Sequence, residues 1–284
     1  MPAGDVTLTR GVGFRDDGLD ASLWTATQTA NVSALFGGDG DILSLTVTFF
    51  NAVSGNNGKA TRSIAGGPST TTYPKVIIRH KDNGIGANAD LTMTVGYSDA
   101  SSSTFTLAKT GSYLPPETFS LTAGKTVNSL EVKIQANTSI IAASYTVDWD
   151  FIFIFKETLT LPAVSKPLQL SLPRTVVELP IPSREGGVLQ DIGSDSARLE
   201  IAGTLVTTTS PNNYTGDNWW DVLVGTWLEG NWQWLGSDRV NYKYEIAELT
   251  VTQNPGQVGY YPFKMTLKKV DILSATAQTF GAIQ

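Results

Sequence analysis

The sequence lacks cysteine and has only one histidine among its 284 residues. Without cysteine, the chain has no disulfide framework, no thiolate metal site and no cysteine nucleophile, and its redox compartment stays open. A serine–histidine–aspartate triad would have to use His80. That residue ends the apolar run KVIIRH with no nucleophile-elbow sequence nearby, which is typical of an ordinary histidine at a strand end.

Charge is also scarce, since charged residues make up 16% of the chain and the net charge is −6. Residues 1–158 and 159–284 have similar acidic balances, so neither part has the basic surface of a nucleic-acid binder. No apolar run approaches the ~18 residues that cross a bilayer. The opening MPAGDVTLTRG has neither the basic nor the apolar region of an export signal. We therefore expect a soluble protein without membrane insertion.

The first half is rich in short runs that alternate apolar and polar residues, such as DILSLTVTFF and DLTMTVGYSD. Glycine, asparagine, proline and serine separate these runs, which predicts an antiparallel β-sandwich over residues 1–158. The last run, residues 144–157, is apolar on both faces in its second half, so we expect it to lie centrally in its sheet. Its alternation places Val147, Trp149, Phe151, Phe153 and Phe155 on one face.

The opening of this domain has an Asp-rich turn, a Leu-Asp pair, a tryptophan and a glycine-rich hairpin before an apolar strand, within residues 13–48. This order resembles the first strands of concanavalin A-like jelly-roll domains. The resemblance covers about half of the chain. It implies a jelly roll with a capacity for sugar binding, and it brings glycosidases of the same fold into consideration.

A retaining glycosidase needs two carboxyl groups roughly 5 Å apart. The Glu-x-Asp-x-x-Glu strand motif of the jelly-roll glucanases is absent, and Asp148 and Asp150 share a strand face without a clear partner. We therefore expect no enzyme activity. Asp16, Asp17 and Asp20 could supply oxygen ligands to a structural Ca²⁺, and the alternative is that they cap exposed turns. No other cofactor is expected.

Proline recurs between short apolar runs in residues 159–174, which predicts a stiff linker. The second domain, residues 175–284, then contains the one convincing helix, near residues 217–229. Its predicted apolar face repeats at helical spacing, and Asp217 is its predicted N-cap. That face consists of Trp220, Leu223, Val224, Trp227 and Leu228. Three tryptophans off this face are candidates for a partner surface: Trp219, Trp232 and Trp234.

Residues 172–205, the tryptophan-rich helix and residues 244–270 occur in an order that resembles the central domain of tailed-virus baseplate and distal-tail hub proteins. The matching features include Arg174, the turn REGGVLQDIG and the charged strand ARLEIAGTL. The resemblance implies a split β-barrel that packs beside copies of itself in a ring around the tail axis. The order departs from that layout, because the sandwich precedes the barrel.

The charged stretch from residue 178 to residue 205 is open to three interpretations. A phosphate-binding loop would lead directly into a helix, whereas this one leads into strands. The others are a solvated hairpin and an oligomer interface in which arginines pair with carboxylates of a neighbour. We favour the interface, with residues Arg184, Glu185, Asp191, Arg198 and Glu200.

Taken together, these patterns favour a structural protein of a virus tail tip or baseplate, from a phage or an archaeal virus. The expected partners are copies of itself in a ring, other tail proteins and host-surface glycans. The expected location is the virion, after assembly in the host cytoplasm. The alternative is a carbohydrate-binding surface or secreted protein, which glycan binding by a monomer would favour.

Overall fold

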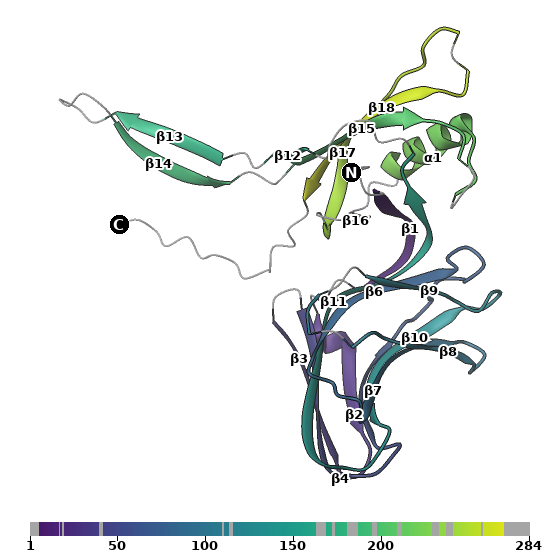
Figure 1. The fold of residues 1–284 in the computed structure, drawn as a ribbon, viewed down its shortest axis with the longest axis vertical. Helices are drawn as coiled ribbons and strands as arrows, with labels where there is room; N and C mark the ends of the chain where they lie inside the picture. Colours follow the sequence, from purple (N-terminus) through teal and green to yellow (C-terminus); the bar gives the residue numbers. More distant parts are fainter. Residues whose placement is uncertain are drawn as a thin grey trace. The chain divides into compact units, whose positions relative to one another are not determined.

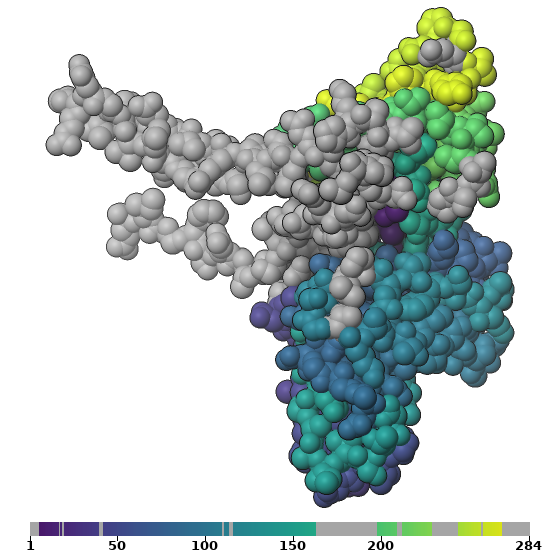
Figure 2. Space-filling model, in the orientation of Figure 1, coloured from purple at the N-terminus to yellow at the C-terminus, as the bar shows by residue number. Residues whose placement is uncertain are grey.

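The structure is a computed structural model. It describes residues 6–16, 18, 20–39, 42–109, 111–113, 116–162, 169–171, 174–180, 187–194, 198–208, 212–228, 233–236, 241–256 and 258–269, and the others are grey in Figures 1 and 2. Strands dominate these ranges, which contain one α-helix, so the predicted mainly β class is confirmed. No helix within them is long and apolar enough to cross a membrane.

The chain forms two compact units. Residues 11–157 belong to the sandwich unit, and residues 1–10 with 158–271 belong to the C-terminal unit. Strands β1 (Thr7–Asp16) and β11 (Ile140–Thr160) each cross the boundary between the units. The start of β1, predicted to be part of the sandwich, lies in the C-terminal unit, because Val6 and Leu8 are buried in the core of that unit.

Two sheets make up the sandwich unit, and Figure 1 shows them as two layers. The first sheet has the order β9-β6-β11-β4-β3, with β1 also beside β11. Its other strands are β3 (Val32–Asp39), β4 (Ile42–Ala52), β6 (Lys75–Asn83) and β9 (Glu117–Ser120). The second sheet has the antiparallel order β2-β5-β10-β7-β8. Its strands are β2 (Trp24–Gln28), β5 (Asn57–Ser63), β7 (Ala89–Tyr97), β8 (Ser102–Thr106) and β10 (Val127–Ala136).

Alternation along each strand separates the core from the surface. In β7 every second residue is buried and the others are partly exposed. One apolar cluster fills the space between the sheets, and Trp24 and Trp149 meet edge to face in it with ring centroids 5.2 Å apart. The period of two therefore sends one face of each strand into a common core.

Strand β11 is central, as predicted, because it pairs with β4 on one side and with β6 on the other. Its predicted face is wrong, however. The register against β6 shifts between Trp149 and Phe151, which inserts an extra residue as a β-bulge does. Beyond the bulge, Ile152 and Ile154 join the inter-sheet core, whereas Phe151 and Phe153 are buried outside it, with their rings stacked at 4.4 Å.

The C-terminal unit is built on a sheet with the order β12-β15-β18-β17-β16, and the start of β1 pairs with β16. The strands are β12 (Gln169–Ser171), β15 (Arg198–Leu205), β16 (Gln233–Gly236), β17 (Asn241–Val251) and β18 (Tyr261–Lys269). Among the described residues no pairing closes this sheet into a barrel. Leu159 and Leu161, at the start of the predicted linker, are buried in the core of this unit.

Helix α1 (Gly216–Leu228) packs on this sheet with a different face from the predicted one. Its buried residues include Trp219, Val222, Leu223 and Thr226, which also recur at helical spacing. The Thr226 hydroxyl is buried, and it donates a hydrogen bond to the carbonyl of Val222 at 2.7 Å. In contrast, Trp227 is 43% exposed.

The N-cap of α1 is also a different residue from the predicted Asp217. Thr215 is the cap, because its hydroxyl accepts the N–H of Asn218 at 3.1 Å. Asp217 lies in the first helical turn and accepts a hydrogen bond from the Tyr261 hydroxyl. That bond, with some burial, raises the pKa of Tyr261 above its usual value.

Strands β13 (Arg174–Pro180) and β14 (Gly187–Ser194) form a separate antiparallel hairpin. No other described strand pairs with either of them.

Candidate functional site

A cluster of polar side chains spans the outward face of the first sheet of the sandwich. We call it the outer cluster, and its members are Ser44, Arg79, Lys81, Tyr113, Asp148 and Asp150. Asp148 lies between Val147 and Trp149, whose side chains point into the core, so its own side chain points outward. In register, Asp148 is opposite Ser44 on β4 and opposite Lys81 on β6. The pairing of three strands therefore assembles one row of polar residues.

Asp148 is held from both sides of this row. The Ser44 hydroxyl donates to Asp148 Oδ1 at 2.6 Å, and Lys81 Nζ lies 3.4 Å from Asp148 Oδ2. The Lys81 and Asp148 side chains are 36% and 19% exposed. Both charges are therefore paired within the protein and still accessible to a ligand.

The β-bulge supplies the second carboxylate. Asp150 is the extra residue between Trp149 and Phe151, and Arg79 is opposite Phe151 on β6. Arg79 Nη1 donates to Asp150 Oδ2 at 2.7 Å, with side-chain exposures of 23% and 10%. The bulge thus brings a guanidinium–carboxylate pair beside the Lys81–Asp148 pair.

Tyr113 joins the two pairs. Its ring centroid is 4.8 Å from Arg79 Cζ and 5.0 Å from Lys81 Nζ, which are cation–π distances. Tyr113 comes from the loop after β8, and no sequence pattern marked it as a site residue. The outer cluster therefore combines an aromatic ring with two cations and two carboxylates.

A row of hydroxyl groups continues from the outer cluster along β4 and β11. Thr46 and Thr146 are in register with oxygens 2.9 Å apart, and Thr48 and Ser144 follow at 3.1 Å. Successive pairs are two residues apart, which is about 7 Å along a strand. The row and the outer cluster together form an elongated polar surface.

The outward face of the second sheet is also polar, but its groups do not converge. Lys59 pairs with Glu131 at 2.7 Å, and the hydroxyls of Thr94 and Thr104 lie 3.0 Å apart. No aromatic side chain occupies an outward position on the five strands of this sheet, all of which the structure describes. This face provides a matched comparison for the outer cluster.

The predicted calcium ligands have other partners. Asp16 accepts hydrogen bonds from Trp24 Nε1 at 2.7 Å and Gly18 N at 3.1 Å, and Arg62 Nη1 lies 2.6 Å from its Oδ2. Asp20 caps the short 3-10 helix η1 (Ala21–Leu23), where the Ser22 hydroxyl and amide lower the pKa of its carboxyl. Asp17 lies outside the described residues. Within the described part, no three His, Cys, Asp or Glu side chains are grouped to hold a metal.

Among the described residues, the carboxylates and the histidine considered for catalysis have other partners. Asp148 and Asp150 are each bound to a cation. His80 is buried, with Nε2 2.9 Å from the carbonyl of Ala108 and 3.5 Å from Glu117 Oε1. Among the described residues no hydroxyl is a partner of His80, so they contain no serine–histidine–aspartate triad.

The predicted interface residues are only partly described. Arg184 and Glu185 lie outside the described residues, and Asp191 is placed by its backbone alone on β14. Arg198 and Glu200 lie on β15, which has neighbours on both sides. Glu200 pairs with Lys264 on the adjacent β18 at 3.1 Å, so this carboxylate already has a partner within the chain.

The predicted aromatic partner surface is wrong at Trp219. Its side chain is fully buried, its Nε1 donates to the Thr208 hydroxyl at 3.2 Å, and its ring meets Tyr214 edge to face. Trp234 is placed on β16 by its backbone only, and Trp232 lies outside the described residues.

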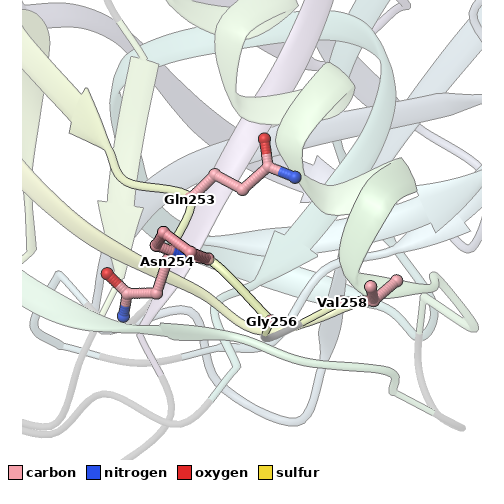
Figure 3. Close-up of a pocket in the computed structure, with 5 residues that line it drawn as sticks. Gln253, Asn254, Gly256 and Val258 are labelled. Carbon is pink, nitrogen blue, oxygen red and sulfur yellow. The ribbon is translucent and has the colours of Figure 1, made fainter.

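A surface depression of about 240 Å³ lies at the turn between β17 and β18. Gln253, Asn254 and Val258 line it, and their side chains point in different directions (Figure 3). None of the described residues that line it has an ionisable side chain. The depression therefore lacks the converging polar groups that fix the orientation of a ligand.

No protein-family model and no curated protein matches the chain. Among solved structures, the chain is similar to the Spr0440 glycoside hydrolase domain, Endo-D, from Streptococcus pneumoniae. The identity is 14% and the TM-score 0.35, over 63% of this chain and 26% of that one. The chain thus spans about a quarter of that protein.

Two further likenesses involve a carbohydrate-binding module and a phage protein. The family 11 carbohydrate-binding module from Clostridium thermocellum, in complex with a β-1,3-1,4-mixed-linked tetrasaccharide, is 13% identical with a TM-score of 0.34, over 54% of this chain and 97% of that one. The enzymatically active domain of bacteriophage CBA120 tailspike protein 4 is 12% identical with a TM-score of 0.34, over 51% of this chain and 21% of that one. These likenesses are distant, so no ligand or reaction is carried over from them.

Proposed function

We propose that this protein binds a neutral carbohydrate, without catalysis, on the outer cluster of the sandwich unit. The observation that carries the proposal is the convergence of Tyr113 with two cation–carboxylate pairs on one partly exposed sheet face. Carbohydrate binding was the alternative to a structural role in a virus tail in the sequence analysis.

The chemistry of the outer cluster matches that of a sugar. A sugar hydroxyl both donates and accepts hydrogen bonds, so it can bridge a carboxylate and a neighbouring cation. The guanidinium of Arg79 is partly exposed while its Nη1 donates to Asp150, and it can give a sugar hydroxyl a charge-assisted hydrogen bond. The partly exposed ring of Tyr113 adds an apolar surface, which suits the C–H face of a pyranose.

Charge balance favours a neutral glycan. Arg79 and Lys81 are matched by Asp148 and Asp150, so the outer cluster has no excess of positive charge to attract an anion. The chain as a whole has a net charge of −6, which repels acidic polysaccharides. The hydroxyl row along β4 and β11 extends the surface beyond one sugar, so we expect an oligosaccharide to bind better than a monosaccharide.

The test is isothermal titration of the full-length protein with a panel of soluble neutral and acidic polysaccharides. Tyr113→Ala should weaken binding to a neutral polysaccharide by about tenfold, because it removes an aromatic contact and the support of both cations. Lys59→Met on the second sheet is the matched control and should bind like the unmodified protein. No binding to any polysaccharide, or equal losses in both variants, would refute the proposal.

The hairpin β13–β14 supports a second candidate function, which is association with copies of the same chain. An isolated two-stranded hairpin is marginally stable in water and presents unpaired backbone groups at both edges. No other described strand covers these edges. We propose that the hairpin extends a sheet of a neighbouring copy. The predicted tail ring and its virion location stay predictions that depend on this association.

Replacement of residues 174–194 by a short Gly-Ser linker tests this second function. We expect the full-length protein to form oligomers by native mass spectrometry and the hairpin-deleted protein to be monomeric. Glycan binding should survive the deletion. A full-length protein that stays monomeric at all concentrations would rule out association through the hairpin, without bearing on the sugar site.

A further inference from the structure

The chain contains two Asn-Gly sequences, Asn57–Gly58 and Asn83–Gly84, in opposite structural settings. In such a sequence the glycine amide nitrogen can attack the side-chain carbonyl carbon of the asparagine. A C–N bond forms, ammonia leaves, and water then opens the cyclic imide to an aspartyl or an isoaspartyl residue. The reaction requires only water. Its rate depends on whether the backbone can bring the nitrogen to the carbonyl carbon.

Asn83–Gly84 is free to reach that geometry. Asn83 is exposed at the last position of β6, and Gly84 follows with φ +77°. Open space surrounds the position where a side chain on Gly84 would lie. Among the residues that the structure describes, no hydrogen bond holds the Gly84 N–H or the Asn83 side-chain amide.

Asn57–Gly58 is held in place. Both residues lie within β5, between β2 and β10, and Gly58 is packed so closely that an added Cβ would be 2.7 Å from Val47. The Asn57 side-chain amide donates to the carbonyl of Gly55 at 3.0 Å. The Asn57 N–H donates to the Thr29 hydroxyl at 2.8 Å. Ring closure there would require the strand to leave its sheet.

We infer that Asn83 is a site of spontaneous deamidation and that Asn57 is protected from it. Deamidation of Asn83 would affect the outer cluster because of where Asn83 lies. Asn83 is opposite Thr146 and two residues from Lys81, so its side chain lies on the outward face that carries the outer cluster. Deamidation adds a negative charge at the edge of that cluster.

The new carboxylate competes with Asp148 for the Lys81 ammonium. The isoaspartyl product also adds a methylene to the backbone next to Asp82, whose Oδ1 accepts the Ile85 N–H at 2.8 Å and closes the turn after β6. Both changes disturb the strand that carries Arg79 and Lys81. We therefore expect the modified protein to bind glycan more weakly, a part of the inference that rests on the proposed function.

The test incubates the folded full-length protein in mildly alkaline buffer and maps its peptides by mass spectrometry. We expect the mass increase of amide-to-acid conversion, with isoaspartate, at Asn83 but not at Asn57 in the same sample. Unfolding in urea should remove this selectivity. Asn83→Gln should stop the accumulation of the acidic form on ion exchange. Equal modification at both sites in the folded protein, or faster modification at Asn57, would overturn the inference.

A separate measurement examines the consequence for binding. The aged protein and Asn83→Asp are compared with Asn83→Gln by titration with a neutral polysaccharide that binds the unmodified protein. We expect weaker binding for the first two only. Unchanged affinity would refute the effect on the outer cluster and leave the site of modification standing. Absence of glycan binding to the unmodified protein would instead refute the proposed function.

Discussion

Two arginine–aspartate pairs in the sandwich unit have nearly the same local chemistry and different surroundings. Arg62 lies 2.6 Å from Asp16 and 5.0 Å from the Phe14 ring, and Arg79 lies 2.7 Å from Asp150 and 4.8 Å from the Tyr113 ring. The Asp16 side chain is 2% exposed, against 10% for Asp150. In both cases, a guanidinium pairs with a carboxylate and contacts an aromatic ring.

The difference lies in what surrounds each carboxylate. Asp16 also binds Trp24 Nε1 and the Gly18 amide, so its hydrogen-bonding capacity is used inside the fold. Arg79–Asp150 instead adjoins Lys81 and Asp148 on a face that solvent reaches. The same residue types thus stabilise the fold where protein surrounds them, whereas the partly exposed Arg79 lies beside a second ion pair that a ligand can reach.

The largest effect is expected from Asp16→Ala. Removal of one partner from a buried pair leaves the other charge uncompensated, so the free energy of unfolding of the sandwich unit should fall by about 3–5 kcal/mol. Urea unfolding followed by tryptophan fluorescence measures this loss. A change below about 1 kcal/mol would show that Asp16–Arg62 behaves like a surface pair. The two arginine–aspartate pairs would then not differ in their contribution to stability.

Arg79→Met should affect glycan affinity more than it affects stability. Affinity for a neutral polysaccharide should fall roughly 10- to 100-fold, because hydrogen bonds from a charged group contribute about 1.5–3 kcal/mol. The unfolding free energy should fall less than in Asp16→Ala. A large loss of stability with unchanged affinity would mean that Arg79 serves the fold, as Arg62 does.

A smaller effect is expected from Thr46→Val, which preserves the shape of the side chain and removes one hydroxyl from the row on β4. Affinity for long oligosaccharides should fall about 2- to 10-fold, since a neutral hydrogen bond contributes roughly 0.5–1.5 kcal/mol. Affinity for a disaccharide should not change. If short and long ligands lose affinity equally, the hydroxyl row is not an extension of the binding surface.

The smallest effect concerns Asp99 in the turn after β7, which pairs with Lys125 at the surface. A hydrogen bond from Lys125, with further bonds from Ser101, lowers the pKa of Asp99 below its ordinary value of 3.8. The stability it contributes is therefore present above pH 3.8 and is lost as the pH falls below that value. Asp99→Asn should therefore lower the stability slightly at neutral pH, and the difference from the unmodified protein should disappear as the pH falls below 3.8. A difference between the two proteins that stays the same at low pH would contradict this assignment.

The strands of the sandwich could be predicted from the sequence because alternation is a local property. DLTMTVGYSD predicts a half-buried strand, and β7 buries every second residue. The faces of β11 could not be predicted in the same way. The bulge at Trp149 depends on the pairing with β6, which is distant in sequence.

The helix illustrates a different limit. Residues 216–228 contain two overlapping apolar sets at helical spacing, one with Trp219 and Val222 and the other with Trp220 and Trp227. Periodicity alone does not choose between them. The choice depends on tertiary partners such as Thr208 and Tyr214, which contact Trp219.

The outer cluster could not be predicted from sequence patterns. Ser44 and Asp148 are 104 residues apart in sequence and hydrogen-bonded in space. Asp148 and Asp150 drew attention as a pair on one strand face, but their partners come from β4, β6 and a loop. Cross-strand register created this cluster, and register is not local information.

The proposed function places the glycan on the outward face of the first sheet of the sandwich. Hydrogen–deuterium exchange of the full-length protein, with and without a saturating neutral oligosaccharide that binds it, tests this most directly. We expect slower exchange in peptides covering residues 44–48, 79–83 and 144–150, and no change in peptides covering residues 57–63 and 129–136. Protection of the second sheet with no protection of the first would contradict this placement.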